Sequence, residues 1–245
     1  MKRTKLKDRT LPNYTKGEEI MNMVSHIVGG VIGVTSLVLC LIFSVKHHDG
    51  YAIAGSIVFG ISMILLFTMS SIYHGLRPEK AKKVFQVIDH CTIFILIAGT
   101  YTPVLLCSLR QINPLLAWWL FGIVWGLAAL GITLNAIDLK KYRVFSMICY
   151  LLMGWCIIVT GPNMLKMLDL GGTILLVAGG VSYTIGAVLY MIGSKIRYFH
   201  FIFHIFVDIG SLLHFLCILL YVIWFKKRLY FNNRDFLFEY FYCYN

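Results

Sequence analysis

Two histidines, His200 and His204, lie four residues apart in an apolar segment of the chain. At this spacing both imidazoles project from one face of a helix, about one turn apart, where they can bind a single divalent metal ion. An imidazole from His74 would complete a three-histidine set that leaves a fourth position for water, the arrangement expected of catalytic zinc. The spacing alone leaves a second interpretation open, because histidine pairs of this kind also occur as hydrogen-bonded core residues.

Two further polar residues suit hydrolytic chemistry. Asp89 can hydrogen-bond a water molecule at the metal, or accept its proton as a general base, because a bound zinc ion lowers the pKa of water to about 7. Ser70 precedes His74 by four residues. It therefore shares a helical face with His74 and could orient an imidazole or donate a hydrogen bond to a developing oxyanion.

The composition indicates that these residues lie inside a membrane. Of 245 residues, 59% are hydrophobic and 13% are charged, whereas soluble domains carry about 25% charged residues. Too few polar groups remain to cover a soluble globule, which excludes a soluble enzyme, a disordered chain and a nucleic-acid-binding module. The net charge of +11 is therefore interpreted as a topology signal, with membrane lipids and no nucleic acid as partners. No CxxC pair occurs among the seven cysteines, so a cysteine zinc site is not indicated.

Seven segments are long and apolar enough to cross a bilayer, so the sequence predicts an all-α bundle of seven transmembrane helices. The predicted spans are Val24–Val45, Tyr51–His74, Val84–Ser108, Pro114–Ile137, Val144–Gly161, Gly171–Gly193 and Phe199–Phe225. We expect a basic amino-terminal segment over residues 1–20, the transmembrane domain over 21–225 and a basic, aromatic tail over 226–245. The first segment lacks the features of a cleavable signal peptide.

The distribution of Lys and Arg predicts the orientation of the bundle. Fifteen of them lie in the amino-terminal segment and in the second, fourth and sixth connections, against three on the other side, Lys46, Arg110 and Lys166. By the positive-inside rule the amino terminus is cytoplasmic and the carboxyl terminus is outside, although the four basic residues of the tail oppose this assignment. In this orientation His74, Asp89, His200 and His204 fall at one depth, near the cytoplasmic face.

Three motifs at these positions resemble a known family. The first enters the first span, the second ends the second span and continues into the third, and the last opens the seventh. They are Glu19-Ile-Met-Asn22-Met-Val-Ser25-His26, Ser70-Ser71-Ile-Tyr73-His74 with Asp89-His90-Cys91-Thr92 and Ala98-Gly99-Thr100-Tyr101-Thr102-Pro103, and His200-Phe-Ile-Phe-His204. Together they resemble the hemolysin III family, the bacterial branch of the adiponectin and progestin receptor group, which is similar to the alkaline ceramidases.

The resemblance implies a multi-pass protein of the plasma membrane with Zn²⁺ held by His74, His200 and His204, Asp89 on the metal's water and Ser70 close by. In the ceramidase relatives such a centre hydrolyses a lipid amide, and in the receptor branch it is associated with lipid-derived signalling. We therefore expect a lipid amide hydrolase or a lipid-linked sensor acting on a lipid-like ligand. The alternatives are a cytolytic, pore-forming protein, as the family name suggests, and a non-catalytic, receptor-like protein with structural zinc.

The sequence leaves the roles of several other polar residues in or near the spans open. Glu19, Asn22 and His26 could support the metal ligands, or could cap the first helix and bond a neighbouring one. Asp208, one turn beyond His204, could be a partner of His204 or a proton-handling group. His214 is expected to form a helix-to-helix hydrogen bond.

The sequence assigns His90 and the tail to packing or to the membrane surface. His90 follows Asp89 and faces another direction, so a packing or interfacial role is the default. The aromatic tail from Tyr230 to Asn245 is expected to lie on the membrane surface, or to be a disordered extension.

Overall fold

The chain folds into a bundle of long helices. A computed structural model describes residues 4–193 and 196–224, and within these ranges it contains helices and no strand. Seven helical segments are long and apolar enough to cross a membrane. The predicted seven-helix, all-α class is therefore confirmed. The predicted side of each terminus stays a prediction, and the tail over 226–245 lies outside the described residues.

The helices follow one another with short connections. The long helices are α1 (Lys16–Lys46), α2 (Gly50–Gly75), α3 (Glu79–Pro103), α5 (Pro114–Asp138), α6 (Arg143–Trp155), α7 (Asn163–Gly193) and α8 (Phe199–Cys217). The shorter elements are the 3-10 helices η1 (Leu6–Asp8) and η3 (Cys156–Thr160), the π-helices η2 (Val104–Leu109) and η4 (Ile218–Trp224), and α4 (Arg110–Ile112).

Most predicted spans coincide with these helices, but the sixth begins earlier than predicted. The sequence places its start at Gly171, whereas α7 begins at Asn163, directly after the turn at Gly161, where φ is 52°. Asp169 has non-helical backbone angles (φ 53°, ψ −178°), so α7 consists of two helical parts, and the second part begins close to the predicted Gly171. Lys166 and the non-helical Asp169 hid the first part of the helix, over residues 163–168, from the hydropathy pattern.

Local sequence signals explain where several helices start. Thr15 and Glu18 form a capping box at the amino terminus of α1, in which each side chain bonds the other residue's backbone N–H. The carboxylate of Asp49 accepts hydrogen bonds from two backbone N–H groups at the start of α2. Asn113 caps α5, and Pro114 occupies its first turn, where proline is favoured.

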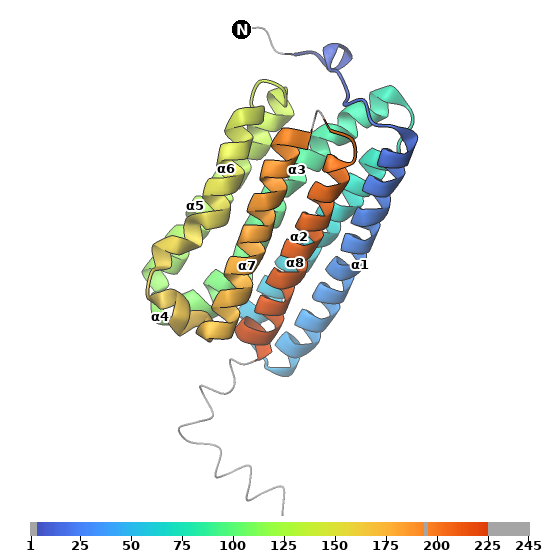
Figure 1. Cartoon of the computed structure of the whole chain (residues 1–245). Coiled ribbons are helices and arrows are strands. Elements are labelled where there is room, and N and C mark those ends of the chain that lie inside the picture. The colour runs from blue at the N-terminus through green and yellow to red at the C-terminus, as the bar shows by residue number, and fades with distance from the viewer. Residues whose placement is uncertain (1–3, 194–195, 225–245) are drawn as a thin grey trace, which may run out of the picture.

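Helix α3 forms the centre of the bundle. Its membrane segment is 83% buried, more than any other span, and it contacts α2, α5 and α6. Helix α1 packs between α2 and α8, and α7 packs along α8 (Figure 1). The amino-terminal ends of α1, α3 and α8 and the carboxyl-terminal end of α2 thus lie at the same end of the molecule.

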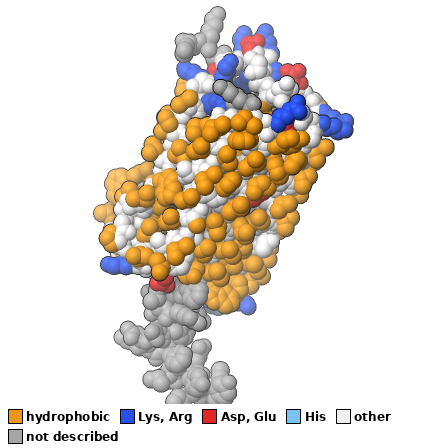
Figure 2. All heavy atoms as spheres, viewed as in Figure 1, with side chains coloured by type: hydrophobic (Ala, Val, Ile, Leu, Met, Phe, Trp, Pro, Cys, Tyr) orange, Lys and Arg blue, Asp and Glu red, His pale blue; other side chains and the backbone are white. Residues whose placement is uncertain are grey.

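The outer surface separates apolar and charged side chains. Figure 2 shows hydrophobic side chains covering the flank of the bundle, with Lys and Arg gathered at the end that carries the amino terminus. Large hydrophobic residues such as Val31, Leu152 and Ile174 are more than half exposed. Such a flank suits hydrocarbon, so these side chains contact membrane lipids.

Helices α2 and α3 approach closely at Gly99. A Cβ atom placed on this glycine would lie 2.6 Å from Cβ of Ser62 and 3.3 Å from the carbonyl oxygen of Val58. Small residues permit this approach in membrane bundles. It matters for the site because α2 carries His74 and α3 carries Asp89.

We predict that Gly99→Ala lowers the unfolding free energy by about 1–3 kcal/mol, because the added methyl group overpacks this contact. Gly122→Ala is a matched control, since no heavy atom lies within 4 Å of the position that its added methyl group would take. The control should keep or slightly raise stability, because alanine is the better helix former. Thermal unfolding in detergent measures both variants, and equal melting temperatures would contradict the close packing at Gly99.

Candidate metal centre

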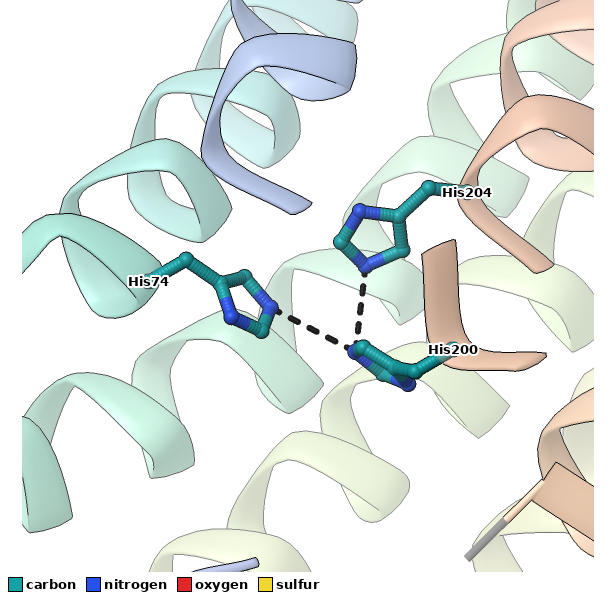
Figure 3. Close-up of side chains that lie close together, drawn as sticks. All are labelled: His74, His200 and His204. Atoms are coloured by element: carbon teal, nitrogen blue, oxygen red, sulfur yellow. Dashed lines mark hydrogen bonds between the residues drawn. The ribbon is translucent and has the colours of Figure 1, made fainter. Parts of the chain in front are cut away.

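Three imidazoles converge where α2 meets α8. His74 comes from the last turn of α2, and His200 and His204 come from the first two turns of α8. The Nε2 atom of His200 lies 3.3 Å from Nε2 of His74 and 3.1 Å from Nε2 of His204 (Figure 3). His74 and His204 are buried, and one nitrogen of each of the three rings lies within 4.8 Å of the others.

The outer nitrogen of His74 is bound by a carboxylate from α1. Oε2 of Glu19 lies 2.7 Å from Nδ1 of His74, and Oε1 of the same residue lies 2.8 Å from Nζ of Lys82. Lys82 also donates a hydrogen bond to the backbone carbonyl of His74. Glu19 therefore supports His74, and the nearby ammonium of Lys82 balances its charge.

The outer nitrogen of His204 also faces α1. Nδ1 of His204 lies 3.2 Å from the carbonyl oxygen of Asn22 and 3.1 Å from Oγ of Ser25. The Ser25 hydroxyl donates to the same carbonyl at 2.9 Å, so its oxygen is free to accept the Nδ1 proton. One helix thus orients histidines from two others.

These partners determine where the ring protons lie. A neutral imidazole carries one N–H. Because the Glu19 carboxylate and the Asn22 carbonyl only accept hydrogen bonds, His74 and His204 carry their protons on Nδ1, and their Nε2 lone pairs face His200. His200 can donate at most one proton, so hydrogen bonds among the rings cannot satisfy all three nitrogens.

The donor set fits a metal ion with nitrogen ligands. Zinc bonds imidazole nitrogen at about 2.0–2.1 Å, so two nitrogens of a tetrahedral site are about 3.3–3.4 Å apart. The two measured separations, 3.3 and 3.1 Å, are close to this value. The second partners on Nδ1 are those that metal-binding histidines commonly have. His74, His200 and His204 could therefore hold zinc with one coordination position left open.

Asp89 and Ser70 line a cavity beside the histidines. This inner cavity has a volume of about 150 Å³, and its lining includes Asp89, Ser70, His200 and His204. The Asp89 carboxylate lies 3.4 Å from Nδ1 of His90, and the structure records no direct contact between Asp89 and the three-histidine cluster among the described residues. A small molecule in the cavity can therefore face both Asp89 and two of the histidines.

The structure distinguishes between the two interpretations of Glu19, Asn22 and His26, namely support of the clustered histidines and capping of α1. The cap of α1 is formed by Thr15 and Glu18, while Glu19 and Asn22 contact the histidines. His26 stacks on the ring of His204 with centroids 3.6 Å apart. It also lines the inner cavity, and neither of its ring nitrogens has a hydrogen-bond partner in the described chain.

Three other polar residues of the spans, His214, Asp208 and His90, differ in their hydrogen-bond partners. His214 bonds the carbonyl of Leu176 on α7 at 3.1 Å, which confirms the predicted helix-to-helix hydrogen bond. Oδ1 of Asp208 has no hydrogen-bond partner among the residues that the structure describes, so it does not bond the His204 ring. His90 lines the inner cavity and contacts the Tyr190 hydroxyl at 3.1 Å, so its role is not packing alone.

The amino-terminal segment adds residues that the sequence did not indicate. The ring of Tyr14 stacks on His200 with centroids 5.0 Å apart, and burial raises the pKa of its hydroxyl. Oε1 of Glu18 accepts a hydrogen bond from the backbone N–H of Tyr198, just before α8. These contacts hold the start of α8 against α1 and cover the histidines.

Comparison with known proteins gives consistent matches. Residues 14–215 match the family described as Haemolysin-III related. The chain is 38% identical over 206 residues to Hemolysin-3 from Bacillus cereus, covering 84% of this chain and 92% of that protein. It is 37% identical over 210 residues to a Hemolysin-3 homolog from Bacillus subtilis, covering 86% and 97%. A more distant relative is the human Monocyte to macrophage differentiation factor, 29% identical over 187 residues, covering 74% and 72%.

We predict that Glu19 and Lys82 stabilise the bundle as a coupled pair. Glu19→Gln should lower the unfolding free energy by about 1–3 kcal/mol, because it leaves the largely buried Lys82 ammonium without its counter-charge. Lys82→Met should also destabilise, and the double variant should lose less than the sum of the single losses by about 0.5–3 kcal/mol.

Thermal unfolding of the four proteins in detergent measures this coupling. Asp8→Asn is the control, because Asp8 is exposed and forms no ion pair with the described residues, and its replacement should not move the melting temperature. Strictly additive single effects would show that Glu19 and Lys82 act independently.

Proposed function

Because the chain belongs to the haemolysin-III related family, we propose that this multi-pass protein of the plasma membrane is a zinc-dependent hydrolase that cleaves an acyl amide of a membrane lipid. The observation that carries the proposal is the convergence of three histidine Nε2 atoms beside a cavity that also contains a carboxylate. The resemblance of the same residues to the alkaline ceramidases supports an amide as the bond that is cleaved.

The cavity supports a lipid as the substrate. Its lining is mainly apolar and aromatic, with Leu96, Ile97, Trp155 and Phe203 among its residues. Its polar side chains include Asp89 and two of the three clustered histidines. The part of an acyl chain nearest its carbonyl can occupy the apolar part of this cavity, which excludes water, while the carbonyl faces the histidines.

Each group has one role in the proposed reaction. Zinc held by His74, His200 and His204 would supply Lewis acidity for the carbonyl group and for water. Asp89 accepts a proton from the attacking water as general base, and the Ser70 hydroxyl donates a hydrogen bond to the oxyanion of the former carbonyl. Glu19 and Asn22 keep His74 and His204 in the required tautomer and orientation.

The bonds and protons of the reaction balance. The oxygen of water forms a bond to the carbonyl carbon, and the carbon–nitrogen bond of the amide breaks. Asp89 transfers the proton taken from water to the leaving nitrogen. The products are a fatty acid and an amine, and Asp89 returns to its ionised form.

We predict that the purified protein binds one equivalent of zinc through its three-histidine cluster. His74→Ala should lose this equivalent, because two ligands from one helix hold the ion too weakly. His214→Gln is a matched control: it removes a buried histidine of α8 that bonds Leu176 instead of the cluster. Metal analysis by mass spectrometry measures the zinc content of both variants, and an unchanged zinc content in His74→Ala would refute the site.

We predict that Asp89→Asn keeps its zinc but releases fatty acid from a ceramide-like lipid about 10²–10⁴-fold more slowly, as expected when a general base is lost. Asp208→Asn is the control, because Asp208 is also a buried carboxylate and does not line the cavity. Fatty-acid release in detergent measures the turnover. A zinc-loaded wild type that hydrolyses no acyl-amide lipid would contradict the enzyme and favour a receptor-like protein with structural zinc.

The names of two relatives, Hemolysin-3 and Hemolysin-3 homolog, supply a cytolytic protein as the second candidate. A conducting path needs polar groups through the whole thickness of the membrane, whereas the polar cluster described above lies at one end of the bundle. Leakage of dye from liposomes tests this candidate. Leakage that persists in His204→Ala would favour cytolysis over zinc chemistry.

A further inference from the structure

A second, polar cleft lies next to the inner cavity. We call it the basic vestibule: it has a volume of about 570 Å³ and is lined by Arg9, Lys140, Arg143 and Arg197, with Glu18 as its acidic member. It lies between the amino-terminal segment, the connection from α5 to α6 and the residues before α8. Four cations thus face one carboxylate.

The carboxylate of Glu18 does not neutralise these cations through direct pairs. Its Oε1 accepts a hydrogen bond from the backbone N–H of Tyr198, and its Oε2 accepts one from the backbone N–H of Thr15, each at 2.8 Å. Both oxygens are thus used by backbone groups. The vestibule keeps an excess of positive charge that an anionic ligand can balance.

The membrane topology explains the positions of three of the four cations that line the vestibule, but not the position of Arg9. The positive-inside rule accounts for the exposed Lys140, Arg143 and Arg197, but Arg9 is only 8% exposed, and its Nε has no hydrogen-bond partner in the described chain. The Asp138 carboxylate interacts electrostatically with Arg9, but its oxygens accept hydrogen bonds from the backbone N–H groups of Thr4 and Lys141. A buried guanidinium donor without a hydrogen-bond acceptor is costly. A guanidinium presents a planar fork of donors that matches a phosphate or carboxylate, so the unused donor of Arg9 indicates an oxyanion as its partner.

The vestibule and the inner cavity are adjacent. Five residues line both of them: His90, Met147, Tyr150, Tyr190 and His200. The guanidinium of Arg143 lies over the ring of Tyr190 at 5.5 Å, at this junction. A molecule with a charged head and an apolar chain would place its head among the arginines and its chain in the inner cavity.

We propose that the basic vestibule binds the phosphate head of a single-chain amphiphile. The site prefers an oxyanion because Arg9 and Arg143 supply charged donors, and it prefers an attached chain because the apolar cavity begins at the same residues. The inference rests on the proposed function only in treating this amphiphile as a substrate of the histidine centre. The same phosphate chemistry could come from a lipid or from free phosphate, and the experiment separates the two.

Binding to the purified full-length protein in a neutral detergent tests the proposal. The probes are lysophosphatidate, a monoacylglycerol with the same acyl chain, and inorganic phosphate. Lysophosphatidate should bind at least about tenfold more tightly than the monoacylglycerol, as expected for hydrogen bonds between charged groups. Its affinity should fall as salt is added, and inorganic phosphate should compete only at much higher concentration.

Two variants and one control connect the binding to the arginines. Arg9→Gln should weaken lysophosphatidate binding about tenfold, and Arg143→Gln, an exposed position that does not threaten folding, should weaken it about two- to fivefold. Neither should change the affinity for the monoacylglycerol. Lys166→Gln removes an exposed cation at the opposite end of the bundle and should change nothing.

Several results would overturn the inference. Equal affinities for lysophosphatidate and the monoacylglycerol would exclude an oxyanion site, as would Arg143→Gln behaving like Lys166→Gln. Inorganic phosphate binding as tightly as lysophosphatidate would exclude the lipid as the source. Zinc content and amide hydrolysis, measured on the same samples, separate the two proposals: arginine-dependent binding without zinc or turnover would refute the proposed function and leave this inference intact.

Discussion

A buried ring nitrogen without a partner is costly between membrane helices, and the pairing of the ring nitrogens of His74 and His204 organises the end of the bundle where α1, α2 and α8 meet. His74 and His204 use their Nδ1 atoms to bind Glu19 and Asn22 of α1. Their Nε2 atoms then face His200 with lone pairs, and no arrangement of protons satisfies all three rings. A cation at this point would remove the conflict and would tie α2 to α8, at a depth where unpaired polar groups are expensive.

The arrangement of α1 makes this cluster possible. Its flank is largely exposed to lipid, yet its first turns carry Glu18, Glu19 and Asn22, all directed into the bundle. Glu18 holds the residue before α8, and Glu19 and Asn22 hold the two histidine-bearing helices. A single helix therefore sets the relative position of α2 and α8. Helices α3, α6 and α7, together with α8, form most of the apolar cavity that begins beside the histidines.

Much of this architecture could be predicted from the sequence because membrane burial leaves few choices. The apolar runs determine the spans, and the scarcity of charges places His74, Asp89, His200 and His204 at a common depth without any knowledge of the fold. The roles of Tyr14 and Arg9 could not be predicted in this way. Both lie before the first span, in a segment with no helical periodicity, and their contacts are with residues far along the chain. The first part of α7, over residues 163–168, was missed because Lys166 interrupts its apolar pattern and the non-helical Asp169 separates it from the rest of the span.

The position of His200 links the proposed chemistry to the proposed ligand. His200 belongs to the histidine cluster, lines the apolar inner cavity and lines the basic vestibule. A ligand with its chain in the cavity and its head among the arginines therefore passes the cluster where the two parts join. In a lipid amide this junction contains the acyl carbonyl and its nitrogen. The proposed hydrolysis would therefore cut the bond between chain and head, and the proposed specificity for the head would depend on residues outside the histidine cluster.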